Sequence, residues 1–568
     1  MEFVILLALI IVVVLYCMIR GSIEEKRQRK IFREHLQHDY GKYEIKKYTT
    51  EQMQAISRLF LKKAEGHTAD FYLDDITWND LNMDSIFAQM NHTQSSSGAE
   101  CLYSMLRFPV QKVHDANNLE DDIQHMQNHE EERVRMQMIL HDLGSTGRFS
   151  LYDYLNLLDN LGKRTNSMHI IGIIAFITSV ALIGISSGLG IFALIVVSCI
   201  NIVTYLKEKN AVLPYLTSFA YIMRMLDCAE TILKEPMTGM KEYEKELTDK
   251  VHALNSLHKN SHLVFQMNAS SGNPFELLFD YIKMLTHIDI IQFNRMLKLV
   301  RDHTTQIEEL TQSIGYLDAV IAIGAYRTSL PYWCVPNLTD DMETTLEIEG
   351  GYHPSLHDAV ANTFCQKCGM LITGSNASGK STFLKMTAIN AILAQTIHTC
   401  AAQRYHGGCY RIYSSMALRD NLDSGESYYI VEIKSLKRIM DAAASNADSP
   451  LLCFVDEVLR GTNTVERIAA SAQILHQLSQ MGAYCFAATH DLELTHLLEA
   501  DYDNYHFEEE VKDGDVLFSY RLLDGRAQSR NAIKLLEVIG FSKEITNQAQ
   551  KMAESFIQSG QWEEQYVR

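Results

Sequence analysis

The chain has 568 residues, enough for several domains, and its 51 basic and 70 acidic side chains give a formal net charge of −19. Non-specific binding to nucleic acid depends on Lys and Arg side chains that neutralise phosphates, so this balance argues against a DNA-binding surface spread over the whole chain. The 11 cysteines follow no regular framework, which indicates reduced thiols in a cytoplasmic protein. Cys365 and Cys368 form a lone C-x-x-C pair whose role stays open.

The first apolar segment runs from Phe3 to Ile19 without a charge or a helix breaker. Its 17 residues are at the short end of what crosses a hydrocarbon core. A cleaved signal peptide is the alternative, but it requires a basic start and a small-residue cleavage site. The chain begins Met-Glu and has Cys-Met-Ile-Arg at 17–20. We therefore predict an uncleaved anchor over residues 1–22, followed by a cytoplasmic helical region over 23–165.

A second apolar block, Met168 to Tyr205, contains no Asp, Glu, Lys or Arg. It is too long for one span at 1.5 Å per residue, and the glycine- and serine-rich stretch 184–190 interrupts it near the middle. We predict a transmembrane hairpin of two helices over 166–206. A buried hairpin of a soluble domain is the alternative, but a soluble core helix rarely lacks polar residues all round.

Basic residues flank the three predicted spans. By the positive-inside rule each basic cluster lies in the cytoplasm. The amino terminus and the Ser186-Ser187 turn would then lie outside, and the soluble parts would share the compartment that holds ATP. We expect a multi-pass membrane protein with three spans. The clusters are Arg20, Lys26, Arg27, Arg29 and Lys30 after the first span, Lys163 and Arg164 before the second, and Lys207 and Lys209 after the third.

Between residues 207 and 345 the pattern is almost wholly helical. Apolar and charged residues recur at i, i+3 and i+4 in Met223–Lys234 and Phe275–Thr311. The pattern is typical of long helices that transmit motion, and no dense basic stripe indicates a base-reading surface.

The segment 374–381 reads Gly-Ser-Asn-Ala-Ser-Gly-Lys-Ser, a complete G-x-x-x-x-G-K-[ST] phosphate-binding loop. The apolar run 370–373 before it predicts a buried strand, and helical spacing predicts a helix over 382–395. Lys380 would reach the β- and γ-phosphates of ATP, and the Ser381 hydroxyl would ligate Mg²⁺. The expected nucleotide-binding residues are Gly374, Ser375, Asn376, Ala377, Ser378, Gly379, Lys380, Ser381 and Thr382.

A second motif follows the apolar run 451–455, which is typical of a central parallel strand. Asp456 at its end would hold Mg²⁺, and Glu457 would polarise the attacking water. An ordinary strand end is the alternative for this acidic pair. A further buried strand, 483–488, ends in Thr489-His490 and places His490 at the same sheet edge as a third candidate catalytic residue.

Together these motifs resemble the ATPase domain of the MutS family of DNA mismatch-repair proteins. The family pattern Thr-Gly-Pro-Asn-x-x-Gly-Lys-Ser-Thr is present at 373–382 with Ser375 in place of Pro, and Glu-Gly-x-His-Pro is present at 349–354 with one extra Gly. Residues 420–432 resemble the family's signature stretch, 456–464 match Asp-Glu-x-x-Arg-Gly-Thr-x-Thr, and 488–494 match Ala-Thr-His-x-x-Glu-Leu. Weaker similarities cover 81–109, near the start of the helical core, and 317–336, which would lead into the ATPase.

The resemblance implies an α/β P-loop NTPase domain of the MutS, ABC-like type over 346–510, preceded by an all-α core and lever region. The transmembrane helices, predicted from the apolar segments, also precede this domain. The resemblance also implies a homodimer, with the end of the ATPase and a helical dimerisation tail over 511–568. His353 would lie beside the nucleotide, and Ser427 would complete the partner's site in trans; an N-cap of the following helix is the alternative for Ser427. The family's amino-terminal mismatch-reading domain and its clamp are not identifiable here.

The expected activity is Mg²⁺-dependent ATP hydrolysis. The resemblance implies that this activity serves mismatched-DNA binding and DNA mismatch repair, with mismatched or branched DNA as a partner. The negative net charge does not support DNA as a partner. The alternative is an ATP-driven mechanochemical protein that acts on a protein partner or the bilayer and has no DNA role.

Overall fold

A computed structural model describes residues 2–42, 45–66, 71–113, 118–146, 150–159, 161–235, 237–255, 257, 281–341, 344–375, 378–416, 428–445, 447–460, 462–512, 515–527, 533, 536 and 539–562. The chain divides into two compact units. The first comprises Met1–Glu65, Asn91–Ser104 and Asp121–Tyr326, and the second comprises Gly66–Met90, Met105–Glu120 and Arg327–Arg568.

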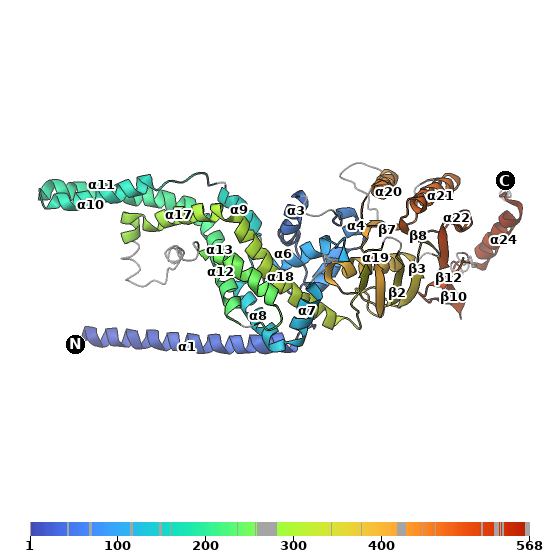
Figure 1. The fold of residues 1–568 in the computed structure, drawn as a ribbon, viewed down its shortest axis with the longest axis horizontal. Helices are drawn as coiled ribbons and strands as arrows, with labels where there is room; N and C mark the ends of the chain where they lie inside the picture. Colours follow the sequence, from blue (N-terminus) through green and yellow to red (C-terminus); the bar gives the residue numbers. More distant parts are fainter. Residues whose placement is uncertain are drawn as a thin grey trace. The chain divides into compact units, whose positions relative to one another are not determined.

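The described part of the first unit is helical (Figure 1). The predicted all-α region before the ATPase is therefore confirmed. Its helices are α1 (Glu2–His38), α2 (Thr50–Ile56), α3 (Arg58–Glu65), the start of α6 (Ser96–Arg107), α7 (Leu119–Asn128), α8 (Glu130–Leu143), α9 (Leu151–Asp159), α10 (Ser167–Ile183), α11 (Ser187–Val212), α12 (Leu216–Lys234), α13 (Lys241–Ala253), α17 (Ile288–Asp302) and α18 (Thr304–Ser329).

Helix α1 continues without a break from Glu2 to His38, well past residue 22, where we expected the anchor to end. Its second half is rich in charges and contacts α8. Arg29 donates to Asp142 at 3.1 Å, and Gln37 donates to Glu130 at 3.0 Å. The apolar and charged parts of this segment therefore belong to one helix, which continues through Gly21 and Ser22 between them.

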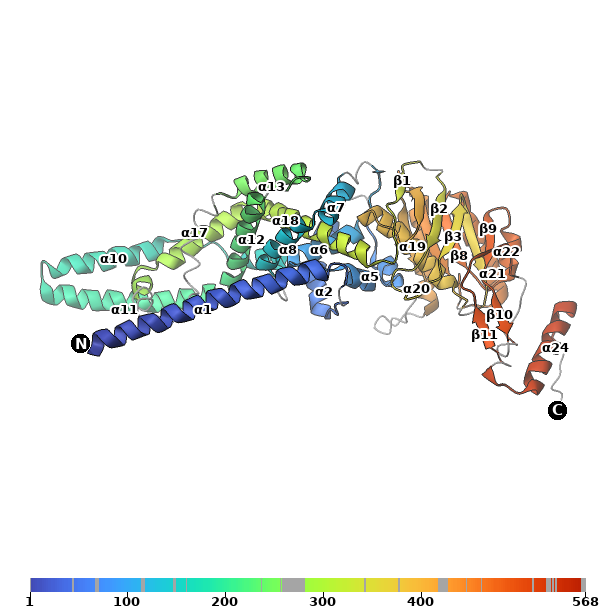
Figure 2. The ribbon, with the colours of Figure 1, turned by 90° about the horizontal axis from the view of Figure 1, so that it is seen from below.

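Helices α10 and α11 lie side by side as a hairpin in both views (Figures 1 and 2). The turn Gly184–Ser186 falls in the glycine- and serine-rich stretch, as the sequence predicts. Among the described residues, only α11 is long and apolar enough to cross a membrane, and α10 is a shorter apolar helix. The structure thus offers one such helix where the sequence predicts three spans. The difference arises because α10 ends after 17 residues and because the apolar start of α1 is largely outside the described side chains.

The predicted continuous pattern 275–311 is divided in the structure. Residues 275–280 lie outside the described residues, α17 begins after His287, which has φ 54°, and His303 separates α17 from α18. Helix α18 then extends to Ser329. Its buried Asp318 accepts the N–H groups of Gln94 at 3.0 Å and Ser95 at 2.8 Å, just before α6. A side chain at Gly98 would meet Asp318 Oδ2 at 2.3 Å, so a glycine is required there.

The second unit is built on a six-stranded sheet of order β12-β9-β4-β8-β7-β6. Its neighbours from β9 to β6 are parallel, and β12 is antiparallel at one edge. β4, β8 and all but the last residue of β7 are buried, as expected for strands covered on both faces. The strands are β4 (Gly369–Thr373), β6 (Arg411–Ser415), β7 (Leu451–Asp456), β8 (Tyr484–Ala488), β9 (Tyr502–His506) and β12 (Leu523–Asp524).

A four-stranded sheet of order β1-β5-β2-β3 and a hairpin complete the strands of this unit that are described. The extra glycine of the 349–354 segment has a structural role here. Gly350 has φ 61°, and the register of β2 against β3 shifts between Ile348 and Gly351, so the inserted residue forms a bulge. These strands are β1 (Asn337–Thr339), β2 (Leu346–Gly351), β3 (Asn362–Gln366), β5 (Arg404–Gly408), β10 (Glu509–Lys512) and β11 (Asp515–Phe518).

Residues 66–90 and 105–120 belong to this second unit, whereas the sequence places them in the amino-terminal helical region. The buried Asp80 carboxylate accepts from the Ser414 hydroxyl at 2.8 Å and the Met416 N–H at 2.9 Å, at the end of β6. Arg438 of α20 forms an ion pair with Asp74, the residue just before α4. The unit's helices are α4 (Asp75–Asp80), α5 (Met83–Met90), α19 (Lys380–Ile397), α20 (Tyr428–Ala444), α21 (Thr464–Gln480), α22 (Leu492–Leu497) and α24 (Lys543–Ser559).

Candidate functional site

The predicted phosphate loop lies between β4 and α19, so the strand, loop and helix follow in the predicted order. Gly374 has φ 147° and Gly379 has φ 108°, conformations that favour glycine. A side chain at Gly374 would meet the Phe507 carbonyl oxygen at 2.8 Å, and one at Gly379 would meet the Tyr520 ring at 3.1 Å. Asn376 and Ala377, two predicted members of the loop, lie outside the described residues.

The Lys380 ammonium lies over its own loop. It donates to the carbonyl oxygens of Gly374 and Ser375, both at 2.8 Å, and its side chain is buried. Burial lowers the pKa of Lys380, and the carboxylates of Asp456 and Glu457 act in the opposite direction. The lysine is thus held close to the loop backbone, where a phosphate would meet both the charge and the N–H groups at the start of α19.

The side chains of Ser381, at the start of α19, and Asp456, at the end of β7, are in contact. The Ser381 hydroxyl donates to the Asp456 carboxylate, which lowers the pKa of Asp456, but burial outweighs this and leaves that pKa raised. Hydroxyl and carboxylate oxygens are ligands that suit Mg²⁺. The structure therefore brings together the two residues that the sequence predicts as metal ligands.

Glu457 has φ 58°, uncommon for a residue with a side chain, and its N–H donates to the Ala488 carbonyl at 2.9 Å. His490 Nε2 contacts Glu457 Oε1 at 2.8 Å, and Arg460 pairs with the other carboxylate oxygen. The hydrogen bond from His490 is the main reason that the pKa of Glu457 falls to about 2. The ends of β7 and β8 therefore place a carboxylate and an imidazole in direct contact.

The segment after β8 is held by a second set of contacts. The Thr489 N–H donates to the Ile372 carbonyl of β4 at 2.9 Å, and the Thr489 hydroxyl accepts the Asp491 N–H at 3.0 Å. Arg467 on α21 donates twice to Asp491, at 2.9 and 2.6 Å. These contacts fix the backbone on both sides of His490, so the orientation of its imidazole depends on β4 and α21 together.

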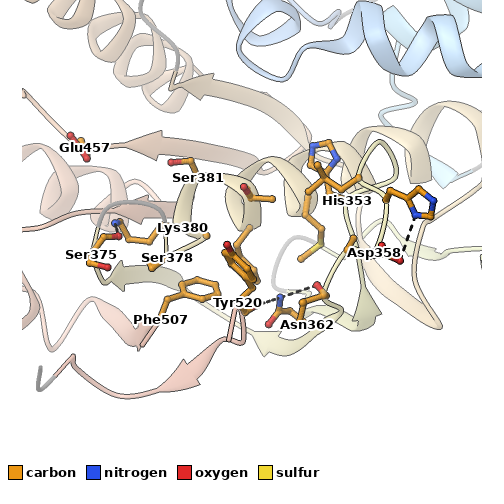
Figure 3. A pocket seen from close by; sticks show the side chains of 18 of the residues that line it. His353, Asp358, Asn362, Ser375, Ser378, Lys380, Ser381, Glu457, Phe507 and Tyr520 are labelled. Carbon is orange, nitrogen blue, oxygen red and sulfur yellow. Dashed lines mark hydrogen bonds and ion pairs between the residues drawn. The ribbon is translucent and has the colours of Figure 1, made fainter. Parts of the chain in front are cut away.

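A cavity of about 520 Å³ opens beside the phosphate loop. Figure 3 shows Lys380, Ser375 and Ser378 on one side of it and His353 toward the other, with Tyr520 between them. Burial and the nearby Lys385 lower the pKa of His353 to about 4, so its ring is neutral at pH 7. The cavity thus pairs a polar, phosphate-sized end with an aromatic wall that suits a planar base.

Several residues in the cavity wall or in contact with the phosphate loop were not predicted. Tyr520 is held by Asn362, which donates to its carbonyl at 3.1 Å and accepts the Leu522 N–H at 2.8 Å. Glu509 on β10 accepts from the Ser375 hydroxyl at 2.7 Å, a contact that depends on the serine found where the family pattern has proline. No local sequence signal marks these residues, because they come from loops and strands far from the phosphate loop.

Two other predicted site features have different outcomes. Ser427 lies outside the described residues. Glu432, which matches the glutamate of the family's signature stretch, is buried and accepts the Arg460 N–H at 3.1 Å. Cys365 is exposed, and Cys368 donates to Asp503 at 3.4 Å. Among the described residues, no cluster of His, Cys, Asp or Glu could hold a metal ion by itself.

One comparison with known protein families concerns this same part of the chain. Residues 370–557 match the family described as MutS domain V. The DNA mismatch repair protein MutS of Rhodopirellula baltica is 32% identical over 261 residues, which cover 44% of this chain and 28% of that protein. MutS protein homolog 4 of Homo sapiens is 29% identical over 293 residues, 47% of this chain and 30% of that protein. MutS protein homolog 4 of Mus musculus is 27% identical over 354 residues, which cover 58% of this chain and 34% of that protein.

The chain thus spans about a third of the length of the curated relatives that it matches. Over residues 370–557 the chain is similar to MutS domain V, and this similarity supports an ATPase domain at the family level.

Proposed function

We propose that this MutS-like chain is a Mg²⁺-dependent ATP hydrolase whose site lies at the carboxyl end of the parallel sheet in the second unit. The observation that supports this most is the convergence of Lys380, the Ser381–Asp456 pair and the Glu457–His490 pair beside one cavity. These groups lie at or after the carboxyl ends of three neighbouring strands, β4, β7 and β8, at one edge of the sheet. Ligands of open α/β sheets bind at this edge.

The residues present fit a nucleotide. The Ser378 hydroxyl oxygen is buried and has no hydrogen-bond partner in the described part of the chain, and a phosphate oxygen would supply one. Lys380 would exchange its two loop carbonyls for the β- and γ-phosphates. The neutral His353 ring and Tyr520 would cover the base.

Mg²⁺ would be held by Ser381 and Asp456, and when bound it neutralises charge on the transferring phosphoryl group. Glu457 is ionised at neutral pH because its pKa is about 2, so it can accept a hydrogen bond from the attacking water. His490 holds one oxygen of this carboxylate and limits its rotation. Arg460 is close enough to turn from Glu457 toward negative charge that develops on the phosphate.

To test the activity, ATP turnover by the purified full-length protein would be measured with Mg²⁺ and with chelator, beside Lys380→Ala. We expect Mg²⁺-dependent turnover and weakened nucleotide binding in the variant, because the fixed positive charge facing the phosphates is lost. Equal binding by Lys380→Ala and the wild type would contradict the site.

We further propose that hydrolysis serves a DNA-linked task of the mismatch-repair type, in a homodimer whose sites Ser427 completes in trans. The similarity to a DNA mismatch repair protein supports this assignment, although the net charge of −19 does not. Short mismatched or branched duplexes should raise ATP turnover more than matched duplex does. Equal turnover with all duplexes and without DNA would remove the DNA role.

A second candidate is a membrane-anchored mechanochemical ATPase without a DNA role. The observation that favours it is the exposed apolar surface of the α10–α11 hairpin, where Ile177 is 60% exposed and Phe192 69%. Soluble proteins rarely expose large contiguous apolar patches. We propose that the hairpin anchors the protein in a bilayer with the ATPase in the cytoplasm, together with the amino-terminal anchor expected from the sequence. Sedimentation with membranes that resists alkaline carbonate would support anchoring, and release would contradict it.

A further inference from the structure

A second cavity, of about 570 Å³, lies at the foot of the apolar hairpin, within the first unit. Helices α10, α11 and α17 and the residues just before α10 form its walls. One wall is apolar and includes Met168, Ala175 and Val197, whereas the other end is polar and includes Arg164 and Lys207. The apolar wall is part of the same two helices that expose Ile171 and Ile200. The lining of the cavity is therefore amphipathic, and α10 and α11 contribute both apolar and polar residues to it.

The polar end contains groups whose hydrogen-bonding capacity is unused. Arg164 pairs with Glu208 at 2.8 Å through Nη1, but its buried Nε has no partner among the described residues. Asn294 is only 7% exposed and donates to Asn166 at 2.9 Å, while its buried Oδ1 likewise has no partner in the described chain. A buried polar group without a hydrogen-bond partner is destabilising, so a ligand that pairs these groups gains affinity.

A histidine pair defines a further acceptor. His287 Nε2 contacts the Asn201 carbonyl oxygen at 2.8 Å and must carry the proton, because a carbonyl only accepts. In the neutral ring its Nδ1 then accepts, so His169 Nδ1, at 2.9 Å, is the donor. His169 Nε2 is left as an acceptor, on a residue that lines the cavity. The polar end thus offers the Lys207 ammonium and an Arg164 N–H beside three acceptors, His169 Nε2, Asn294 Oδ1 and the Glu208 carboxylate.

We propose that this cavity binds the head group of an aminophospholipid, with its phosphate at Lys207 and Arg164 and its ammonium at the acceptors. An acyl chain would follow the apolar wall from Met168 to Ala175. A zwitterionic head group with N–H donors matches both sets of groups, whereas a choline head group lacks the donors and a glycerol head group lacks the positive charge. The inference rests on the membrane anchoring proposed above and adds a lipid class and a site to it.

The test is mass spectrometry of lipid retained by the full-length protein after mild detergent extraction and incubation with equal amounts of phosphatidylethanolamine, phosphatidylglycerol and phosphatidylcholine. We expect selective retention of phosphatidylethanolamine. Lys207→Ala removes the cation and Ala175→Phe fills the apolar wall, and each should lower retention roughly tenfold, which corresponds to about 1.4 kcal/mol. ATP turnover should not change, which also shows that the variants are folded.

Two matched controls separate the site from general effects. Lys163→Ala removes an exposed charge that does not line the cavity, and Ala181→Phe adds the same ring to an exposed position of α10. Both should retain phosphatidylethanolamine like the wild type. If the protein still sediments with membranes, either of two results would overturn the head-group site. These are equal retention of the three lipids, and an equal loss of retention in variants and controls. Failure to sediment with membranes would instead overturn the anchoring and this inference with it.

Discussion

Helices α19 and α11 are both apolar, but their surroundings are opposite. Of the 18 residues of α19, 15 are buried, because the sheet and its neighbouring loops cover it. Of the 26 residues of α11, only Gly190, Asn201, Tyr205 and Val212 are buried. Apolar area removed from water contributes about 25 cal/mol per Å². For α19 the rest of the protein buries the apolar area and supplies this free energy. The exposed apolar area of α11 can be buried only by a partner or a membrane outside the described chain.

The comparison shows why a run of apolar residues does not define its environment. α19 begins at the phosphate loop and carries Lys380 and Ser381 on its first turn, so its burial fixes the position of the proposed catalytic site. α11 carries the polar residues Asn201 and Tyr205 only near its foot, where Asn201 donates to the Gly172 carbonyl at 3.1 Å and Tyr205 donates to Asp289 at 2.7 Å. Above this foot α10 covers one side of α11, and the side chains on its other side are exposed (Figure 1).

The largest expected effect is a loss of ATP turnover that leaves the membrane association of the hairpin unchanged. Glu457→Gln should leave nucleotide binding and membrane sedimentation intact and slow ATP turnover by about a hundredfold or more, the scale of a positioned acid–base group. Single-turnover hydrolysis and equilibrium binding of labelled ATP would be measured on the same preparation. Wild-type turnover in this variant would mean that Glu457 does not position the water.

The second prediction tests burial directly. Leu393→Ala in α19 should lower the free energy of unfolding by about 2–5 kcal/mol, because it leaves a cavity in a closed core. Ile195→Ala in α11, where the side chain is 58% exposed, is the matched control and should change it by less than about 0.5 kcal/mol. The temperature at which ATPase activity is lost would be compared in detergent. A larger fall for Ile195→Ala would reverse the comparison.

A smaller effect is expected from mixing two inactive variants. Ser427→Ala and Lys380→Ala should each be nearly inactive alone, and sites formed in trans leave one intact site in each heterodimer. Random assortment should then restore about a quarter of wild-type turnover. Heterodimers would be verified by pull-down through two different tags. Heterodimers without recovered activity would exclude a composite site and favour a capping role for Ser427.

The last prediction is a labelling pattern rather than a change in rate. After native cysteines are removed, Ser186→Cys in the hairpin turn should react with an impermeant thiol reagent on intact cells, whereas Val465→Cys should react only after lysis. Val465 is 76% exposed on the second unit, so lack of labelling before lysis would reflect the membrane rather than burial. Labelling of Val465→Cys alone on intact cells would reverse the predicted orientation.

Much of the nucleotide edge could be predicted from the sequence because its motifs are local. The loop 374–381, the run 451–456 and the turn near Ser186 each depend on residues next to one another, and the structure has the strand, helix and hairpin boundaries within a few residues of those predicted. The Ser381–Asp456 and Glu457–His490 contacts also follow, because parallel strands end at the same edge.

Contacts between distant segments were beyond local patterns. Nothing near Asp80 indicates that it accepts from Ser414 more than 300 residues away, which joins residues 66–90 to the ATPase unit. The same holds for Glu509 at Ser375 and for the His169–His287 pair at the foot of the hairpin. The sequence by itself determined the phosphate loop, its strand and helix, and the two apolar stretches, because backbone conformation and hydrophobic periodicity act over a few residues. Only the tertiary structure decided which apolar helix is covered and which polar groups meet, because burial and hydrogen bonding depend on where distant segments come to lie.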